Sequence, residues 1–141
     1  MAALADTSAW AWSRKTGYSH LRQAFDERLL EGAIATCAMV KLELLYSTRS
    51  ASEFRERRAQ LDLLDDCPIG PGQWSRALDV MNALAATGGM HHRSVKWADL
   101  LIAAAAEAAG VAVLHYDEDY VRIAAITGQP FEWLAPRGTL E

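Results

Sequence analysis

Short apolar runs alternate along this chain with longer segments whose apolar residues recur at helical spacing. Residues 2–6, 33–36 and 111–115 have the length and continuous apolar character of buried strands, and residues 131–134 are typical of an edge strand. Helical spacing predicts helices over residues 7–12, 18–31, 37–48, 51–64, 74–86, 96–109 and 118–127. Gly32 and Gly110 follow two of these segments, as expected where helices end.

Strands that alternate with helices in this order predict an α/β fold. Right-handed crossovers would join parallel strands and bring helices to both faces of the sheet. We expect a single domain over residues 1–141, with a central parallel sheet of four to five short strands flanked by helices. Ligands of such sheets bind at the carboxyl ends of the strands.

Two of the predicted helices carry more detailed expectations. Thr7 or Ser8 is available as the N-cap of the first helix. The segment 37–48 is apolar on nearly every side, and Lys41 and Glu43 are its only charges. We therefore expect this helix to be buried, with Glu43 directed at a specific partner.

Acids stand where core-facing residues would be expected in four apolar segments. They are Asp6 after the first strand, Glu43, Asp99 in the first turn of its helix, and Asp117 with Asp119 after the strand 111–115. Charged carboxylates are rarely buried unless they are paired or bind a metal. The lysines within these segments, at positions 41 and 96, are too few to pair every acid. One Mg²⁺ or Mn²⁺ ion would satisfy several of them.

Composition excludes several other classes of protein. The net charge of −4 argues against a chain that coats nucleic acid through its whole surface. The longest apolar stretch, residues 100–114, is too short and too polar to span a bilayer, and the N-terminus lacks the basic region of a signal peptide. We expect a cytoplasmic protein with no membrane contact. Cys37 and Cys67 fit no zinc or disulfide pattern, so both are expected to be buried thiols.

The acidic motifs resemble those of PIN-domain ribonucleases, and more narrowly the VapC-type toxins of toxin–antitoxin pairs. The resemblance rests on DTSAW after the first strand, VKLELL, ADLLIAAAA and VLHYDEDY, in that order along nearly the whole chain. It implies a PIN domain that hydrolyses RNA with Mg²⁺ or Mn²⁺, forms a homodimer, and is inhibited by a VapB-type antitoxin that inserts a basic side chain among the acids. It assigns metal binding and catalysis to Asp6, Glu43, Asp99 and Asp117, with Asp119 as an auxiliary metal ligand.

Other residues have less direct assignments. His115 stands where many members carry Thr or Ser, and we expect it, with Ser8, to support the acids through hydrogen bonds. Ser8 could equally cap its helix. A basic groove for the RNA backbone could include Arg55, Arg58, His92, Arg93 and Lys96. Trp10, Trp12 and Trp97 near the proposed site are expected to be core residues.

Three of the acids also have a simpler explanation. Asp6 could be a helix N-cap, Glu43 could pair with Lys41 or a distant arginine, and Asp99 could interact only with the helix dipole. A non-catalytic PIN-like module that binds RNA or protein is therefore the alternative function. A nucleotide-binding domain is disfavoured because DTSAW, and not a glycine-rich loop, follows the first strand.

Overall fold

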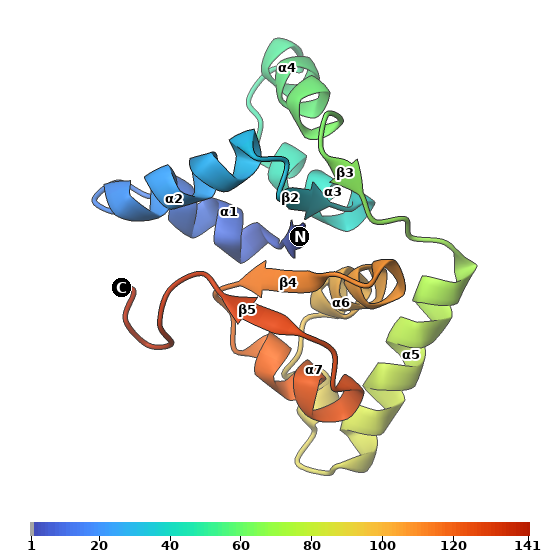
Figure 1. Cartoon of the computed structure of the whole chain (residues 1–141). Coiled ribbons are helices and arrows are strands. Elements are labelled where there is room, and N and C mark those ends of the chain that lie inside the picture. Colours follow the sequence, from blue (N-terminus) through green and yellow to red (C-terminus); the bar gives the residue numbers. More distant parts are fainter. Residues whose placement is uncertain (1) are drawn as a thin grey trace.

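A parallel sheet of five strands forms the centre of the computed structural model, which describes residues 2–141. The strand order is β3-β2-β1-β4-β5, and every neighbouring pair is parallel (Figure 1). The strands are β1 (Ala3–Ala5), β2 (Ile34–Thr36), β3 (Asp65–Asp66), β4 (Ala112–His115) and β5 (Phe131–Trp133). The predicted α/β fold with a central parallel sheet is therefore confirmed.

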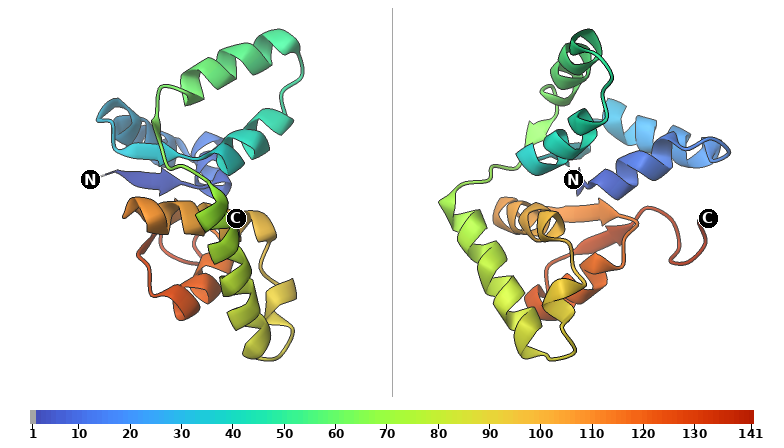
Figure 2. Two further views of the ribbon diagram at one scale, coloured as in Figure 1. Left: turned by 90° about the vertical axis from the view of Figure 1, so that its right-hand side faces the viewer. Right: turned by 180° about the vertical axis from the view of Figure 1, so that it is seen from behind.

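Seven α-helices connect or follow these strands among the described residues. They are α1 (Thr7–Arg14), α2 (Ser19–Leu30), α3 (Ala38–Tyr46), α4 (Ala51–Leu61), α5 (Pro71–Ala86), α6 (Trp97–Ala109) and α7 (Asp119–Thr127), and a short 3₁₀ turn covers His91–Arg93. The views in Figure 2 show helices on both sides of the sheet, with α4 projecting at one end of the molecule.

The alternation of side chains along the strands creates two apolar layers. Leu4 and Val113 face a large core formed with α3, α5, α6 and α7. Their neighbours Ala5 and Leu114 face a smaller cluster that includes Phe25 from α2. Because both faces are covered, the central strands β1, β2 and β4 are mostly apolar, which explains why they appear as continuous apolar runs in the sequence.

Two helix boundaries differ by three residues from the sequence prediction. The helix expected over residues 51–64 ends at Leu61, and the chain then forms β3 from two exposed aspartates, which pair with Ala35 and Thr36 of β2. Because acidic residues are depleted in strands, no sequence pattern predicted β3. The helix α5 begins at Pro71, three residues before the predicted start, because proline is well suited to the first helical turn.

Two expectations about burial were wrong. In α3 only Val40 and Leu45 are buried, while Leu42 and Tyr46 are 64% and 92% exposed. Trp97 is 60% exposed and is not a core residue. Both cysteines are buried thiols, as predicted. Within residues 2–141, every helix falls short of the length and apolar character needed to cross a bilayer.

Candidate metal centre

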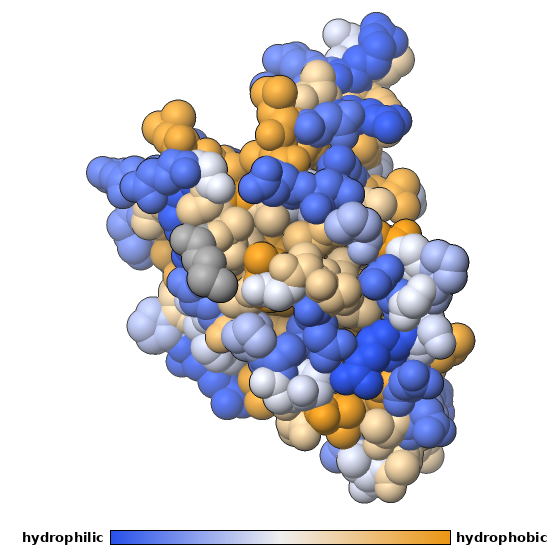
Figure 3. Space-filling view, turned by 45° about the vertical axis from the view of Figure 1, so that its right-hand side comes forward, coloured by the Kyte–Doolittle hydropathy of each residue, from blue (hydrophilic) through white to orange (hydrophobic). Residues whose placement is uncertain are grey.

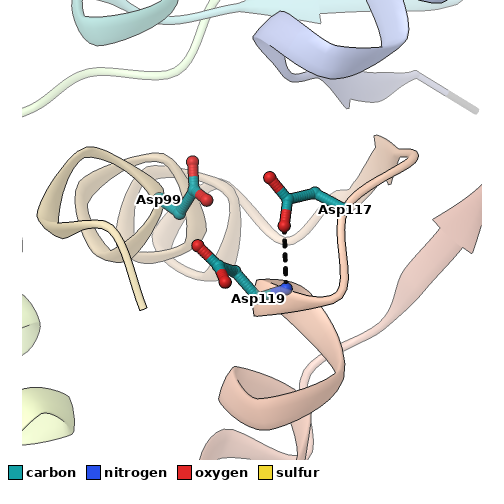
Figure 4. A group of neighbouring side chains, drawn as sticks. All are labelled: Asp99, Asp117 and Asp119. Atoms are coloured by element: carbon teal, nitrogen blue, oxygen red, sulfur yellow. Dashed lines mark hydrogen bonds between the residues drawn. The ribbon is translucent and has the colours of Figure 1, made fainter. Parts of the chain in front are cut away.

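Three aspartates meet beside the carboxyl end of β4. Asp99 comes from the first turn of α6, Asp117 follows β4, and Asp119 is the first residue of α7 (Figure 4). Each offers a carboxylate oxygen, and these oxygens all lie within 4.8 Å of one another. We call these three residues the acidic cluster. Of the acids expected at this edge of the sheet, the structure groups Asp99 with Asp117, and Asp119 joins them.

Asp99 is the most deeply placed member of the cluster. The residue is 4% exposed, and the Tyr120 hydroxyl donates a hydrogen bond to its Oδ1 at 3.3 Å. Its Oδ2 is buried and has no hydrogen-bond partner among the described residues. Burial raises the pKa of Asp99 well above its usual range, and the neighbouring aspartates add to this rise. The folded chain thus opposes the charged form of Asp99 unless a cation is close.

Backbone hydrogen bonds fix the loop that carries the other two aspartates. The Asp119 N–H donates to Asp117 Oδ1 at 2.9 Å, the contact drawn in Figure 4. The Asp117 N–H in turn donates to His115 Nδ1 at 3.1 Å. His115 Nδ1 must therefore be unprotonated, so the neutral ring carries its proton on Nε2. Burial lowers the pKa of His115 to about 4, which is consistent with the neutral ring.

Asp6 is the N-cap of α1, so the prediction that Thr7 or Ser8 caps this helix is wrong. Its Oδ1 accepts from the Ala9 N–H at 2.9 Å and from Ser8 Oγ at 2.7 Å. Ser8 Oγ also accepts from the backbone N–H of Tyr116 at 2.8 Å, which ties α1 to the residue after β4. Burial raises the pKa of Asp6 to about 6, with a contribution from the Asp117 charge. Through Ser8, Asp6 is therefore joined to the residue that precedes Asp117.

Glu43 lies outside the acidic cluster. It is half-buried, and its Oε1 accepts from Thr7 Oγ1 at 2.8 Å. The alternative pairing with Lys41 is wrong, because Lys41 Nζ instead lies 2.8 Å from Asp62. Thr7 and Glu43 are among the residues that line a cavity of about 710 Å³ between α1, α3 and α4. Glu43 is thus hydrogen-bonded to Thr7, which follows Asp6, but its carboxylate is not part of the acidic cluster.

Lys96 contacts the acidic cluster directly. Its Nζ lies 2.8 Å from Asp117 Oδ2 and 3.8 Å from Asp99 Oδ2, and its backbone N–H donates to Asp119 Oδ2 at 2.9 Å. Burial lowers the pKa of Lys96, but its aspartate partners outweigh that effect and the net direction is upward. The ammonium is therefore charged at neutral pH.

The other basic residues predicted to bind RNA lie elsewhere on the chain. Arg55 and Arg58 are exposed on α4, where Arg58 pairs with Asp62 at 3.5 Å. His92 and Arg93 lie in the 3₁₀ turn before α6, and the His92 Nδ1 is buried without a hydrogen-bond partner in the described chain. Their contact with RNA remains a prediction.

The donor set fits a hard divalent cation. All donors in the cluster are carboxylate oxygens, which Mg²⁺ and Mn²⁺ prefer. The buried Asp99 Oδ2 has no hydrogen-bond partner, and its nearest cation, Lys96 Nζ, lies 3.8 Å away, beyond hydrogen-bond distance. Asp99, Asp117 and Asp119 are therefore the residues best placed to hold an ion.

Tyr120 was missed as a site residue. The sequence showed only that an aromatic residue follows Asp119. Tyr120 is completely buried, and buried tyrosine hydroxyls usually find a hydrogen-bond partner. That rule pointed to a polar contact, but only the packing of α7 against α6 identifies the partner as Asp99.

Comparison with known proteins gives a consistent result. The family model described as PIN domain matches residues 3–126. The chain is 47% identical over 135 residues to ribonuclease VapC18 of Mycobacterium tuberculosis, covering 96% of each chain, and 39% identical to ribonuclease VapC51 of the same organism, covering 86% of each. A DNA-bound VapBC structure from Salmonella typhimurium has a TM-score of 0.70 at 18% identity, covering 96% of this chain and 100% of that one.

Proposed function

Because this chain belongs to the PIN-domain family, we propose that it is a metal-dependent endoribonuclease toxin of the VapC type. It would hydrolyse RNA phosphodiester bonds with water as the attacking group. The close relative VapC18 carries the name ribonuclease, and the similarity extends over nearly the full length of both chains. We further propose that residues 1–141 act as one domain in the cytoplasm, where the RNA substrate is available.

The observation that carries this proposal is the group of converging carboxylates with an unpartnered buried oxygen on Asp99. A purely structural role for Asp99 would leave that oxygen costly and unused. Asp99, Asp117 and Asp119 would hold Mg²⁺ or Mn²⁺. A bound divalent cation makes water a stronger acid and offsets negative charge on the phosphate.

The chain's own residues keep these carboxylates in position. Tyr120 orients Asp99 through its hydroxyl, and His115 holds the backbone N–H of Asp117. Ser8 fixes Asp6 at the edge of the same site. We assign Asp6 a supporting electrostatic or ligand role, and Glu43 a role at the rim beside the cavity, where substrate would approach.

We propose that a VapB-type antitoxin inhibits this activity. The solved structures with the same fold include VapBC toxin–antitoxin complexes. Because the acidic cluster gathers negative charge, a basic side chain of the antitoxin would be attracted to it and would block access to the site.

We also propose a homodimer, supported by apolar side chains exposed near the start of α6. Trp74, Leu78 and Trp97 are 54%, 68% and 60% exposed and line a shallow hollow of about 90 Å³. Apolar side chains also stand among hydrophilic ones on the face in Figure 3. Aromatic residues in a contiguous patch are typical of interfaces. Light scattering should give twice the chain mass of 15.5 kDa.

The function is tested by incubating the purified chain with structured RNA. Cleavage should require Mg²⁺ or Mn²⁺ and stop with EDTA. Asp99→Asn should lose at least about a hundredfold in rate, since it removes an ionisable ligand from the buried centre. Asp6→Asn should lose activity as well.

Asp79→Asn is the matched control. Asp79 is an exposed acid on α5, so its replacement changes net charge equally but leaves the acidic cluster intact. It should cleave at the wild-type rate. Cleavage that persists in EDTA, or an Asp99→Asn variant as active as the wild type, would contradict the proposal and favour a non-catalytic RNA- or protein-binding module.

A further inference from the structure

Lys96 makes a contact with every member of the acidic cluster. Its ammonium bonds to Asp117 Oδ2, the same ammonium faces Asp99 Oδ2, and its backbone N–H bonds to Asp119. The side chain is nevertheless 65% exposed, whereas the Asp99 side chain is 6% exposed. The lysine therefore reaches the buried carboxylates from the solvent side of the site.

The position of the ammonium coincides with the place where positive charge is most needed. Carboxylates whose oxygens lie within 4.8 Å repel one another when charged, and a single ammonium between two of them offsets part of that repulsion. A divalent cation held by the cluster would use the same oxygens. Two cations that bind one oxygen from the same side repel each other, so they cannot both keep close contact with Asp117.

We infer that Lys96 is a built-in counter-ion that stabilises the metal-free site and competes with the divalent cation for it. This inference rests on the proposed metal-dependent function. When the ion binds, the lysine ammonium gives up its bond to Asp117 and moves toward solvent. Its flexible four-carbon stem and its exposure make that movement inexpensive.

Competition of this kind has a specific signature. Removing the ammonium should make the metal-free protein less stable, because the aspartates lose their neutralising partner. The same change should make metal binding tighter, because the ion no longer displaces a bound cation. A residue with only a structural role would weaken both properties or change stability alone.

The test measures Mn²⁺ binding by the electron paramagnetic resonance signal of the free ion, together with thermal unfolding in EDTA. Lys96→Met should bind Mn²⁺ about tenfold more tightly than the wild type. In the wild type the ion has to displace the charged hydrogen bond between Lys96 and Asp117, and that bond is weak for its kind because the lysine is exposed. It should also unfold at a lower temperature in EDTA.

Lys41→Met is the matched control. Lys41 forms a lysine–aspartate pair of the same 2.8 Å length with Asp62, which is not part of the acidic cluster. This variant should keep wild-type Mn²⁺ affinity. Lys96→Gln retains a side-chain donor and provides a second test if the methionine variant does not fold, with the same increase in affinity expected.

The outcomes separate this inference from the proposed function. Unchanged or weaker Mn²⁺ binding by the folded Lys96 variants would overturn the counter-ion role while leaving the metal site in place. Failure of the wild-type chain to bind Mn²⁺ would overturn the metal-dependent function and this inference together.

Discussion

Asp99→Asn should make the metal-free protein more stable even though it should slow RNA cleavage. The substitution keeps the shape of the side chain and the acceptor for the Tyr120 hydroxyl, but replaces the partnerless Oδ2 by a neutral amide donor. That donor would face the carboxylates of Asp117 and Asp119, which lie nearby. The variant therefore removes a carboxyl group whose charged form burial disfavours and adds a hydrogen-bond donor among acceptors.

The magnitude follows from the burial of this oxygen. An unsatisfied buried polar atom costs about 1–3 kcal/mol. The variant also loses the ion pair between Lys96 Nζ and Asp99 Oδ2, which lie 3.8 Å apart. This loss lowers the free energy of unfolding by less than about 1 kcal/mol, because the lysine side chain is mostly exposed. The net gain in unfolding free energy is about 1–2 kcal/mol, which corresponds to a rise in Tm of about 3–8 °C for a chain of this size.

Thermal or urea unfolding in EDTA measures this gain directly. Asp79→Asn should leave stability within about 0.5 kcal/mol of the wild type, because Asp79 is exposed. Adding Mn²⁺ at tenfold its dissociation constant should stabilise the wild type by about 1.4 kcal/mol and the Asp99→Asn variant by much less. The stability difference should therefore shrink as the ion is added.

A metal-free Asp99→Asn protein less stable than the wild type would refute this reasoning. It would mean that the carboxylate is favourably solvated or paired in the folded state, so that its burial is not a cost relieved by metal. A stabilisation by Mn²⁺ equal in both proteins would show that the ion binds elsewhere.

Three further predictions follow from other contacts. Ser8→Ala should lower stability by about 1–2 kcal/mol and reduce the cleavage rate, measured by urea unfolding and RNA cleavage, because Ser8 joins Asp6 to the residue after β4. Leu78→Lys should shift the protein to monomer in light scattering, since Leu78 is 68% exposed in the apolar patch, whereas unchanged mass would argue against that interface. Cys37 and Cys67 should resist a thiol reagent until the chain unfolds, because burial raises the pKa of both thiols, to about 11 for Cys67, and fast native reaction would contradict their burial.

The sequence was most informative about the acids that follow strands. Asp6 and Asp117 were predicted at strand ends because continuous apolar runs precede them, and both lie there. Asp99 was predicted in a first helical turn and occupies one. Local spacing sufficed in these cases, since a strand end or a helix start is set by residues within a few positions.

Burial was predicted less well where it depends on the neighbouring elements. The apolar segment 37–48 indicated a buried helix, yet Leu42 and Tyr46 are exposed, because they line an open hollow between α3 and α4 and not a packed core. The strand β3 was missed because its two aspartates pair with β2 through the backbone, and backbone pairing does not require apolar side chains.

The sequence by itself determined the order of the helices and of four of the five strands, the parallel sheet and the acids that stand at its carboxyl edge. Only the tertiary structure decided that Asp119 joins Asp99 and Asp117 while Glu43 bonds to Thr7, and that Lys96 reaches the same carboxylates. The reason is physical: residue type and spacing fix local conformation, whereas contacts such as that between Ser8 and Tyr116 join residues 108 positions apart and depend on how the whole chain packs.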